Sequence, residues 1–240
     1  DIQIIQEITL EEAFRGAERS VAFRTFIACA VCGGKGHDAA AGTSTCKACN
    51  GKGESKVERR TVFGSFTQVG VCSACHGKGS VPNKKCVACG GRGRVSGTRE
   101  ASVQIVSGVD NDQVMVVRSM GEAGEEGSVS GDLYVIIKVR PHSVFTRRKD
   151  DLFMKKEVAL TDVFLGRKIE MKDIGGEPFS IAVPPGFDVN EKLRIPGRGM
   201  PRAGLRSGRG DLYITLGLKS PKKLSARAKK LLEDLGEELY

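Results

Sequence analysis

Four copies of one short cysteine motif, CxxCxGxG, limit what the middle of this 240-residue chain can fold into. The copies read CAVCGGKG, CKACNGKG, CSACHGKG and CVACGGRG, and together they contain all eight cysteines. Two thiolates three residues apart suit one tetrahedral metal ion, and the glycines let backbone N–H groups approach the sulfur atoms. The pattern therefore predicts two closed four-cysteine sites, each with one structural Zn²⁺ ion.

The sequence between the second and third copies indicates how the cysteine pairs combine. The stretch KVERRTVFGSFTQVGV contains two β-prone runs around Gly64 and Ser65 and predicts a hairpin. A hairpin brings its ends together, so the inner two pairs share one ion and the outer two pairs share the other. The predicted ligands are Cys46, Cys49, Cys72 and Cys75 for the inner site and Cys29, Cys32, Cys86 and Cys89 for the outer site. Because large apolar residues are few here, metal binding supplies the folding energy, on the order of 10 kcal/mol per site.

The positive charge of the chain gathers in the same segment. The formal net charge is +9, and residues 29–99 hold twelve Lys and Arg against three acidic residues, or 12 − 3 = +9. This charge makes zinc-dependent nucleic-acid binding an alternative function, although anionic zinc–thiolate centres also explain it and we favour that explanation. Thiol–disulfide exchange is a second alternative. Four near-identical copies disfavour it, because exchange centres use one exposed thiol of low pKa.

A duplicated domain flanks the cysteine segment. Three residues of TLEEAFRG recur in LTDVFLG at an offset of 160 − 10 = 150: Leu10, Phe14 and Gly16 match Leu160, Phe164 and Gly166. The tetrapeptide GDLY occurs at 131–134 and 210–213, at an offset of only 210 − 131 = 79. The offset shrinks across the cysteines, so the cysteine segment is inserted into the first copy.

Local signals in both copies predict strand, short helix and strand. Thr9 and Glu12 form a capping-box pattern, Gly16 ends the helix, and the alternation in 20–28 predicts a strand. At the chain end Ser225 is a candidate N-cap for an amphipathic helix. Its apolar stripe, which can pack on its own domain or on a second subunit, contains Leu231, Leu232, Leu235 and Leu239.

These patterns predict a mostly β fold with two tandem barrel- or sandwich-like domains, an elongated two-zinc arm inserted in the first, and a C-terminal helix. The expected boundaries are 1–28 plus 100–144, 29–99, 145–220 and 221–240. No apolar run approaches the roughly 20 residues that cross a bilayer, so we expect no membrane association. His37, His76 and His142 have no catalytic partners in the sequence, no phosphate-binding loop is present, and we expect a protein that is not an enzyme.

The motifs resemble those of the type A DnaJ co-chaperones. Besides the four CxxCxGxG copies, GEAGEEG…GDLYV, RPHSVFTRRKDDL and GRGMPRAGLRSGRGDLYI are similar to signature stretches of that family. The resemblance covers essentially the whole chain. It departs at the front, where the J domain and the Gly/Phe-rich linker are absent, so we expect client binding without stimulation of a DnaK-type ATPase. FGSFTQV is similar to cyanobacterial and plastid members, which suggests a cytoplasmic or plastid-stroma location.

The resemblance implies a chaperone of protein folding and the stress response that binds unfolded clients and hands them to a DnaK-type partner, usually as a homodimer. It also implies that a client segment adds as a strand and places apolar side chains in a groove of the first β-domain. An exposed sheet edge attracts such a strand. By position, the groove residues are Ile2, Val21, Phe23, Ala101, Val103 and Phe145. Each of them is also of a type that forms ordinary sandwich cores.

Overall fold

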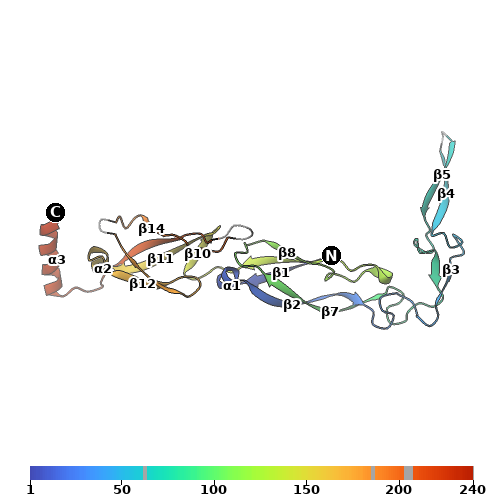
Figure 1. Cartoon of the computed structure of the whole chain (residues 1–240), viewed down its shortest axis with the longest axis horizontal. Helices are drawn as coiled ribbons and strands as arrows, with labels where there is room; N and C mark the ends of the chain where they lie inside the picture. Colours follow the sequence, from blue (N-terminus) through green and yellow to red (C-terminus); the bar gives the residue numbers. More distant parts are fainter. Residues whose placement is uncertain (62–63, 185–186, 203–207, 240) are drawn as a thin grey trace. The chain divides into compact units, whose positions relative to one another are not determined.

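A computed structural model describes residues 1–61, 64–184, 187–202 and 208–239; the side chains of 56–68 and of Leu239 lie outside the described residues. The chain is mostly β, as predicted (Figure 1). Its elements are β1 (Ile2–Ile8), α1 (Leu10–Arg15), β2 (Ala17–Ala28), β3 (Thr43–Thr45), β4 (Glu54–Thr61), β5 (Gly64–Val71), β6 (Ser80–Pro82), β7 (Arg94–Ile105), β8 (Val114–Val117), η1 (Glu125–Gly127), β9 (Leu133–Val139), β10 (Phe145–Arg148), β11 (Asp151–Ala159), α2 (Leu160–Phe164), β12 (Lys168–Lys172), β13 (Pro178–Ala182), β14 (Lys192–Ile195), β15 (Leu212–Lys219) and α3 (Ala226–Leu239).

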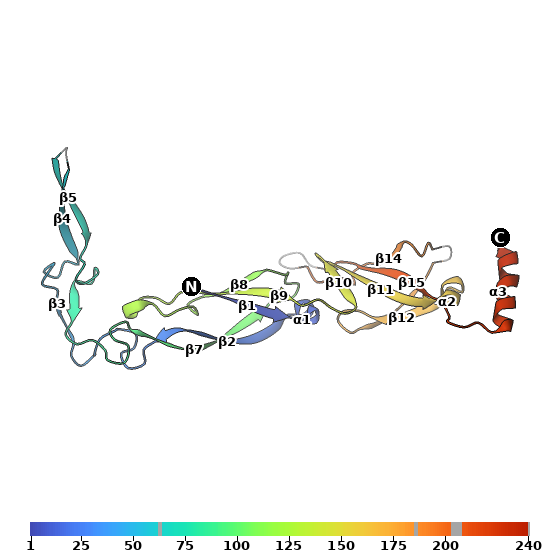
Figure 2. The same ribbon diagram turned by 180° about the vertical axis from the view of Figure 1, so that it is seen from behind.

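One compact unit comprises residues 1–6, 19–103 and 114–136 and contains the cysteine segment. Its strands form the three-stranded sheet β1-β9-β8 and the pairs β2-β7, β3-β6 and β4-β5. Strands β1 and β9 continue beyond the boundaries of this unit. Seen from behind, β4 and β5 again lie side by side as a ribbon (Figure 2). Apolar packing in this unit centres on the buried residues Val103, Leu133 and Val135. In the described part of the cysteine segment, the buried clusters are instead two groups of cysteines, each with one partly buried valine against it.

The predicted hairpin between the second and third cysteine pairs is present as β4 and β5. Its antiparallel register runs from Glu54 opposite Val71 to Thr61 opposite Gly64. Gly64 and Ser65, around which the sequence suggested the turn, are therefore the first residues of β5. Residues 62–63, which connect the strands, lie outside the described residues. The short pair β3-β6 continues the antiparallel pairing, with Thr45 opposite Ser80.

The second compact unit comprises residues 7–18, 104–113 and 137–240. Its main sheet has the order β10-β11-β15-β14, in which β11 and β15 are parallel and the other pairs are antiparallel. The inward side chains Leu152, Leu212 and Ile214 are completely buried, as is Met200. In the described residues no helix is both long enough and apolar enough to cross a membrane.

The predicted duplication is visible as two runs of strand, short helix and strand, β1-α1-β2 and β11-α2-β12. The two helices begin differently. Thr9 Oγ1 accepts from the Glu12 N–H at 3.2 Å and the Glu12 carboxylate accepts from the Thr9 N–H at 2.9 Å, which completes the predicted capping box of α1. Helix α2 follows Ala159 and has no side-chain cap. At α3 the predicted N-cap is confirmed, because Ser225 Oγ accepts from the Ala228 N–H at 3.1 Å.

A buried carboxylate joins the glycine-rich stretch near residue 200 to the β12-β13 turn. The Asp173 carboxylate is 3.0 Å from the Arg198 guanidinium and 3.4 Å from that of Arg209, and it accepts from the Glu177 N–H at 2.9 Å. Burial raises the pKa of Asp173, but the hydrogen bond from Glu177 and the two guanidinium groups lower it overall. The second arginine of GRGMP…GRGDLY, Arg209, also lies over the Phe14 ring, 4.6 Å from its centroid.

Candidate metal centres and peptide-binding surface

The eight cysteines form two groups of four. Within each group the sulfur atoms all lie within 4.8 Å of one another, and every side chain is buried. The inner group contains Cys46, Cys49, Cys72 and Cys75, and the outer group contains Cys29, Cys32, Cys86 and Cys89. These are the combinations that the hairpin argument predicts. All eight are free thiols and none forms a disulfide.

The sulfur positions fit one tetrahedral ion per group. Four ligands at about 2.3 Å from a central Zn²⁺ lie about 3.8 Å from one another. In the outer group Cys32 Sγ is 3.9 Å from Cys89 Sγ. In the inner group the Cys49–Cys75 separation is 3.7 Å. An all-sulfur set leaves no coordination position for a substrate, so each group can hold a structural metal ion but cannot activate water.

The last glycine of each motif helps to hold the sulfur atoms in place. In each copy its N–H donates to the second cysteine of the same motif, at 3.2 to 3.3 Å: Gly36 to Cys32, Gly53 to Cys49, Gly79 to Cys75 and Gly93 to Cys89. Hydrogen bonds of this kind offset the negative charge of a thiolate and orient it toward a metal.

The same glycines also explain why each motif needs its partner. A Cβ atom at Gly36 would lie 2.3 Å from the Gly91 carbonyl oxygen, and one at Gly93 would lie 2.1 Å from that of Gly34. The inner group repeats this reciprocal contact with separations of 2.5 and 2.4 Å. Two motifs of one group therefore pack backbone against backbone, and any side chain at the last glycine would push them apart.

One thiol in each group loses its proton easily. Backbone N–H groups of Cys75 and Ala74 lower the pKa of Cys72 to about 7. Burial raises the pKa of Cys89, but N–H groups of Gly93 and Gly91 lower it to about 7 overall. Because metal ligation requires thiolates, these two sulfur atoms are the ones most ready to bind a metal at neutral pH.

The six residues expected to form the client groove differ in how much of their surface is exposed. Val21, Ala101 and Val103 are buried, at 6%, 2% and 1% exposure. Ile2 on β1 and Phe23 on β2 keep part of their surface exposed. In this structure Val21, Ala101 and Val103 are therefore packed core residues. Of these five side chains, a ligand could directly reach only those of Ile2 and Phe23.

The sixth residue, Phe145, lies in the second compact unit, whereas the other five belong to the first. Its ring packs on His142, with the centroids 5.3 Å apart, and it lines a cavity of about 360 Å³ together with Leu10 and Pro141. The imidazole Nδ1 of His142 accepts from the Val144 and Phe145 N–H groups, at 3.0 Å each. The other nitrogen, Nε2, lies 3.1 Å from the Glu11 carboxylate. His142 therefore ties the turn before β10 to the start of α1.

The sequence alone did not reveal the role of the acidic stretch GEAGEEG, which suggested a flexible turn. In the structure this stretch contains η1, whose two glutamates are tied to basic side chains of the cysteine segment. Glu125 is 2.7 Å from the Arg94 guanidinium, and Glu126 pairs with Lys78. The opposite charges of the two stretches were the only signal available in the sequence, because about 48 residues separate Lys78 from Glu126.

A comparison with known families agrees with the geometry. The sequence profile described as "DnaJ C terminal domain" matches residues 2–221 of this chain. The chain belongs to the DnaJ family. The chain is 41% identical over 248 residues to "Chaperone protein DnaJ 2" of Aquifex aeolicus, and this alignment covers 100% of the chain and 64% of the relative.

Other relatives of the family are similar over the same extent. "Chaperone protein DnaJ" of Carboxydothermus hydrogenoformans is 38% identical over 99% of the chain and 62% of its own length. The protein of the same name from Fusobacterium nucleatum subsp. polymorphum is 34% identical over 100% of the chain and 60% of its own length. The chain thus spans less than two thirds of the length of these DnaJ relatives.

Proposed function

We propose that this chain is the client-binding part of a DnaJ-type chaperone. It captures unfolded or partly folded polypeptides on the first β-domain, and in the full-length protein it delivers them to a DnaK-type ATP-dependent chaperone. The observation that carries the proposal is the match to the DnaJ C-terminal domain over residues 2–221, combined with two four-cysteine groups.

The sheet topology supports capture by strand addition. Among the described strands, β1 is the outer strand of β1-β9-β8, and β2 pairs only with β7. Each therefore offers a free edge to an extended peptide, and the partly exposed Ile2 and Phe23 lie on these two strands. An apolar anchor buried at such a site contributes roughly 1.5–3 kcal/mol, from which the ordering of the client must be subtracted. Capture at one site is consequently weak.

The metal in each four-cysteine group is proposed to be Zn²⁺, which prefers four thiolates in a tetrahedron and needs no redox partner. Its task is to fold a segment that lacks an apolar core. Thiol–disulfide exchange is disfavoured further by the structure. All eight thiols are between 1% and 6% exposed, whereas exchange requires a thiol that a substrate disulfide can reach.

The proposed function predicts that the zinc-loaded chain suppresses aggregation by itself. When a chemically denatured test protein is diluted into buffer, light scattering should fall as the chain is added, without ATP. A several-fold molar excess is expected to be needed, because single-site affinity is weak. An equal mass of a folded protein without free sheet edges serves as the control. Scattering that stays unchanged at about tenfold excess would contradict client binding.

The apolar surface of the second unit supports a homodimer. Phe164 on α2 is 66% exposed, whereas Arg209 covers its counterpart Phe14 in the first copy. On α3, Leu231, Leu232 and Leu235 are between 42% and 60% exposed. Exposed apolar faces of this kind mark protein interfaces, and a second copy of this chain is the proposed occupant.

We therefore expect Leu232→Ser to dissociate the dimer. In a twofold interface each substitution acts twice, so the loss of about 2 kcal/mol per leucine weakens dimerisation roughly a thousandfold. Sedimentation velocity across a concentration series measures this effect. The matched control is Lys229→Ser, which changes an exposed residue of the same helix. A wild-type chain that sediments as a monomer at all concentrations, or a variant that dimerises normally, would refute the interface.

A further inference from the structure

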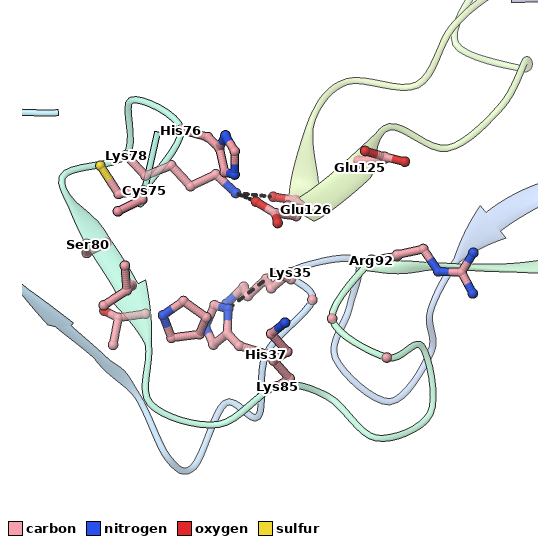
Figure 3. A pocket seen from close by; sticks show the side chains of 17 residues that line it. Lys35, His37, Cys75, His76, Lys78, Ser80, Lys85, Arg92, Glu125 and Glu126 are labelled. Atoms are coloured by element: carbon pink, nitrogen blue, oxygen red, sulfur yellow. Dashed lines mark hydrogen bonds and ion pairs between the residues drawn. The ribbon is translucent and has the colours of Figure 1, made fainter. Parts of the chain in front are cut away.

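A cleft of about 410 Å³ opens between the two cysteine groups and the η1 turn. The side chains that give it its character are cations and imidazoles from the first and third motifs and from the residues next to the first and fourth: Lys35, His37, His76, Lys78 and Lys85. Figure 3 shows them around a common space. We refer to this space as the basic cleft.

One carboxylate of the chain already lies in the basic cleft. The Lys78 ammonium group pairs with the Glu126 carboxylate and lies 3.3 Å from the Glu126 carbonyl oxygen. The Glu126 N–H donates to the Arg92 carbonyl oxygen at 3.1 Å. Glu125 points away from the cleft (Figure 3). The chain thus places a single acidic side chain of its own where a ligand would bind.

The basic cleft holds more positive charge than Glu126 neutralises. In the part of the chain that the structure describes, Lys35 and Lys85 form no ion pair. The hydrogen bond from Lys78 lowers the pKa of Glu126, and the charges of His76 and Lys85 lower it further. The neighbouring Lys84 differs, because it pairs with Asp38 at 3.8 Å and does not line the cleft.

The metal centres do not use these lysines as direct hydrogen-bond donors. The thiolates accept from the N–H groups of the motif glycines, for example from Gly36 to Cys32 at 3.3 Å and from Gly79 to Cys75 at 3.3 Å. Among the described residues no lysine donates to a cysteine sulfur. The ammonium groups of Lys35 and Lys85 are therefore available for an external anion.

We propose that the basic cleft binds an acidic segment of a partner polypeptide, with two or more neighbouring carboxylates, and that this segment displaces Glu126 from Lys78. The seated Glu126 shows that a carboxylate on a peptide backbone fits the space. No Phe, Tyr or Trp lines the cleft, so the large aromatic faces on which the bases of single-stranded nucleic acids stack are missing, and the cationic lining favours an acidic peptide. This binding goes beyond the proposed capture of apolar clients and does not depend on it.

The test measures fluorescence anisotropy of a labelled peptide with four consecutive glutamates, added to the zinc-loaded 240-residue chain. We expect Lys85→Glu to weaken binding about tenfold or more, because it reverses a charge that faces the ligand. We expect Glu126→Gln to strengthen binding about tenfold, because it removes the internal competitor. The matched control Lys84→Glu makes the same charge change at the preceding residue, which does not line the cleft, and should alter binding by less than about twofold. Zinc content of two ions per chain shows that each variant is folded.

Several results would overturn the proposal. Equal weakening by Lys84→Glu and Lys85→Glu would show that the overall charge acts and not the cleft. If Glu126→Gln binds the peptide as before or more weakly, the Glu126 carboxylate does not compete with the peptide for Lys78. A peptide with four glutamines that binds as tightly would exclude recognition of carboxylates. If a single-stranded oligonucleotide of equal charge displaces the peptide at much lower concentration, the cleft is a nucleic-acid site instead.

Discussion

Replacing Cys72 with serine is expected to reduce the bound zinc from two ions per chain to one and to unfold the inner half of the cysteine segment. A serine hydroxyl is a poor ligand for Zn²⁺, and the remaining three thiols lose most of a binding free energy on the order of 10 kcal/mol. Apolar packing cannot compensate, because among the side chains that the structure describes only Val81 packs against the inner group. The outer group keeps its four cysteines and should keep its ion.

Elemental analysis measures the zinc content, and hydrogen exchange measures the unfolding. The amides of Cys46 and Cys72 bond to the Gly79 and Gly53 carbonyls at 2.9 Å in the intact inner group, so the Cys46 amide should exchange much faster in the variant. Ser73→Ala is the matched control, since Ser73 is the exposed neighbour of Cys72. A Cys72→Ser chain that retains two ions and slow exchange would show that metal does not fold this segment.

The second large effect is expected from Phe23→Asp, which should abolish suppression of aggregation while both zinc ions stay bound. Phe23 is partly exposed on β2, so a charged side chain there can still reach water in the free chain and loses that contact when a client binds. The variant loses an apolar anchor worth roughly 2–3 kcal/mol, which corresponds to a roughly 30- to 150-fold lower affinity. A carboxylate that the client must desolvate weakens binding further.

Ala22→Asp is the control for this experiment. Ala22 is exposed, and because side chains alternate along a strand it lies on the opposite face of β2. Val21→Asp is less informative, since Val21 is buried and an aspartate there would destabilise the sheet itself. Normal protection by Phe23→Asp would remove the groove assignment, and equal loss in Ala22→Asp would show that added charge alone is responsible.

The sequence predicted those parts of the molecule that depend on local patterns. The capping box at Thr9 and Glu12, the duplicated strand, helix and strand, and the grouping of the cysteines all follow from residues close together or from one hairpin. The exposure of individual groove residues could not be predicted, because Val21 and Phe23 lie on the same face of β2 and differ only in what covers them. The contact of Lys78 with Glu126 was out of reach because it joins distant segments.

The nesting of one four-cysteine group inside the other has a consequence for how the chain matures. A ribosome releases Cys29, Cys32, Cys46 and Cys49 before the two later pairs that complete their groups, and these four thiols could already trap an ion together. All four motifs share the two glycines of the CxxCxGxG pattern, so these glycines do not select the correct partner motif. The β4-β5 ribbon does, since it delivers the third pair beside the second. Fidelity of metal loading is thus encoded in strands that contain no ligand.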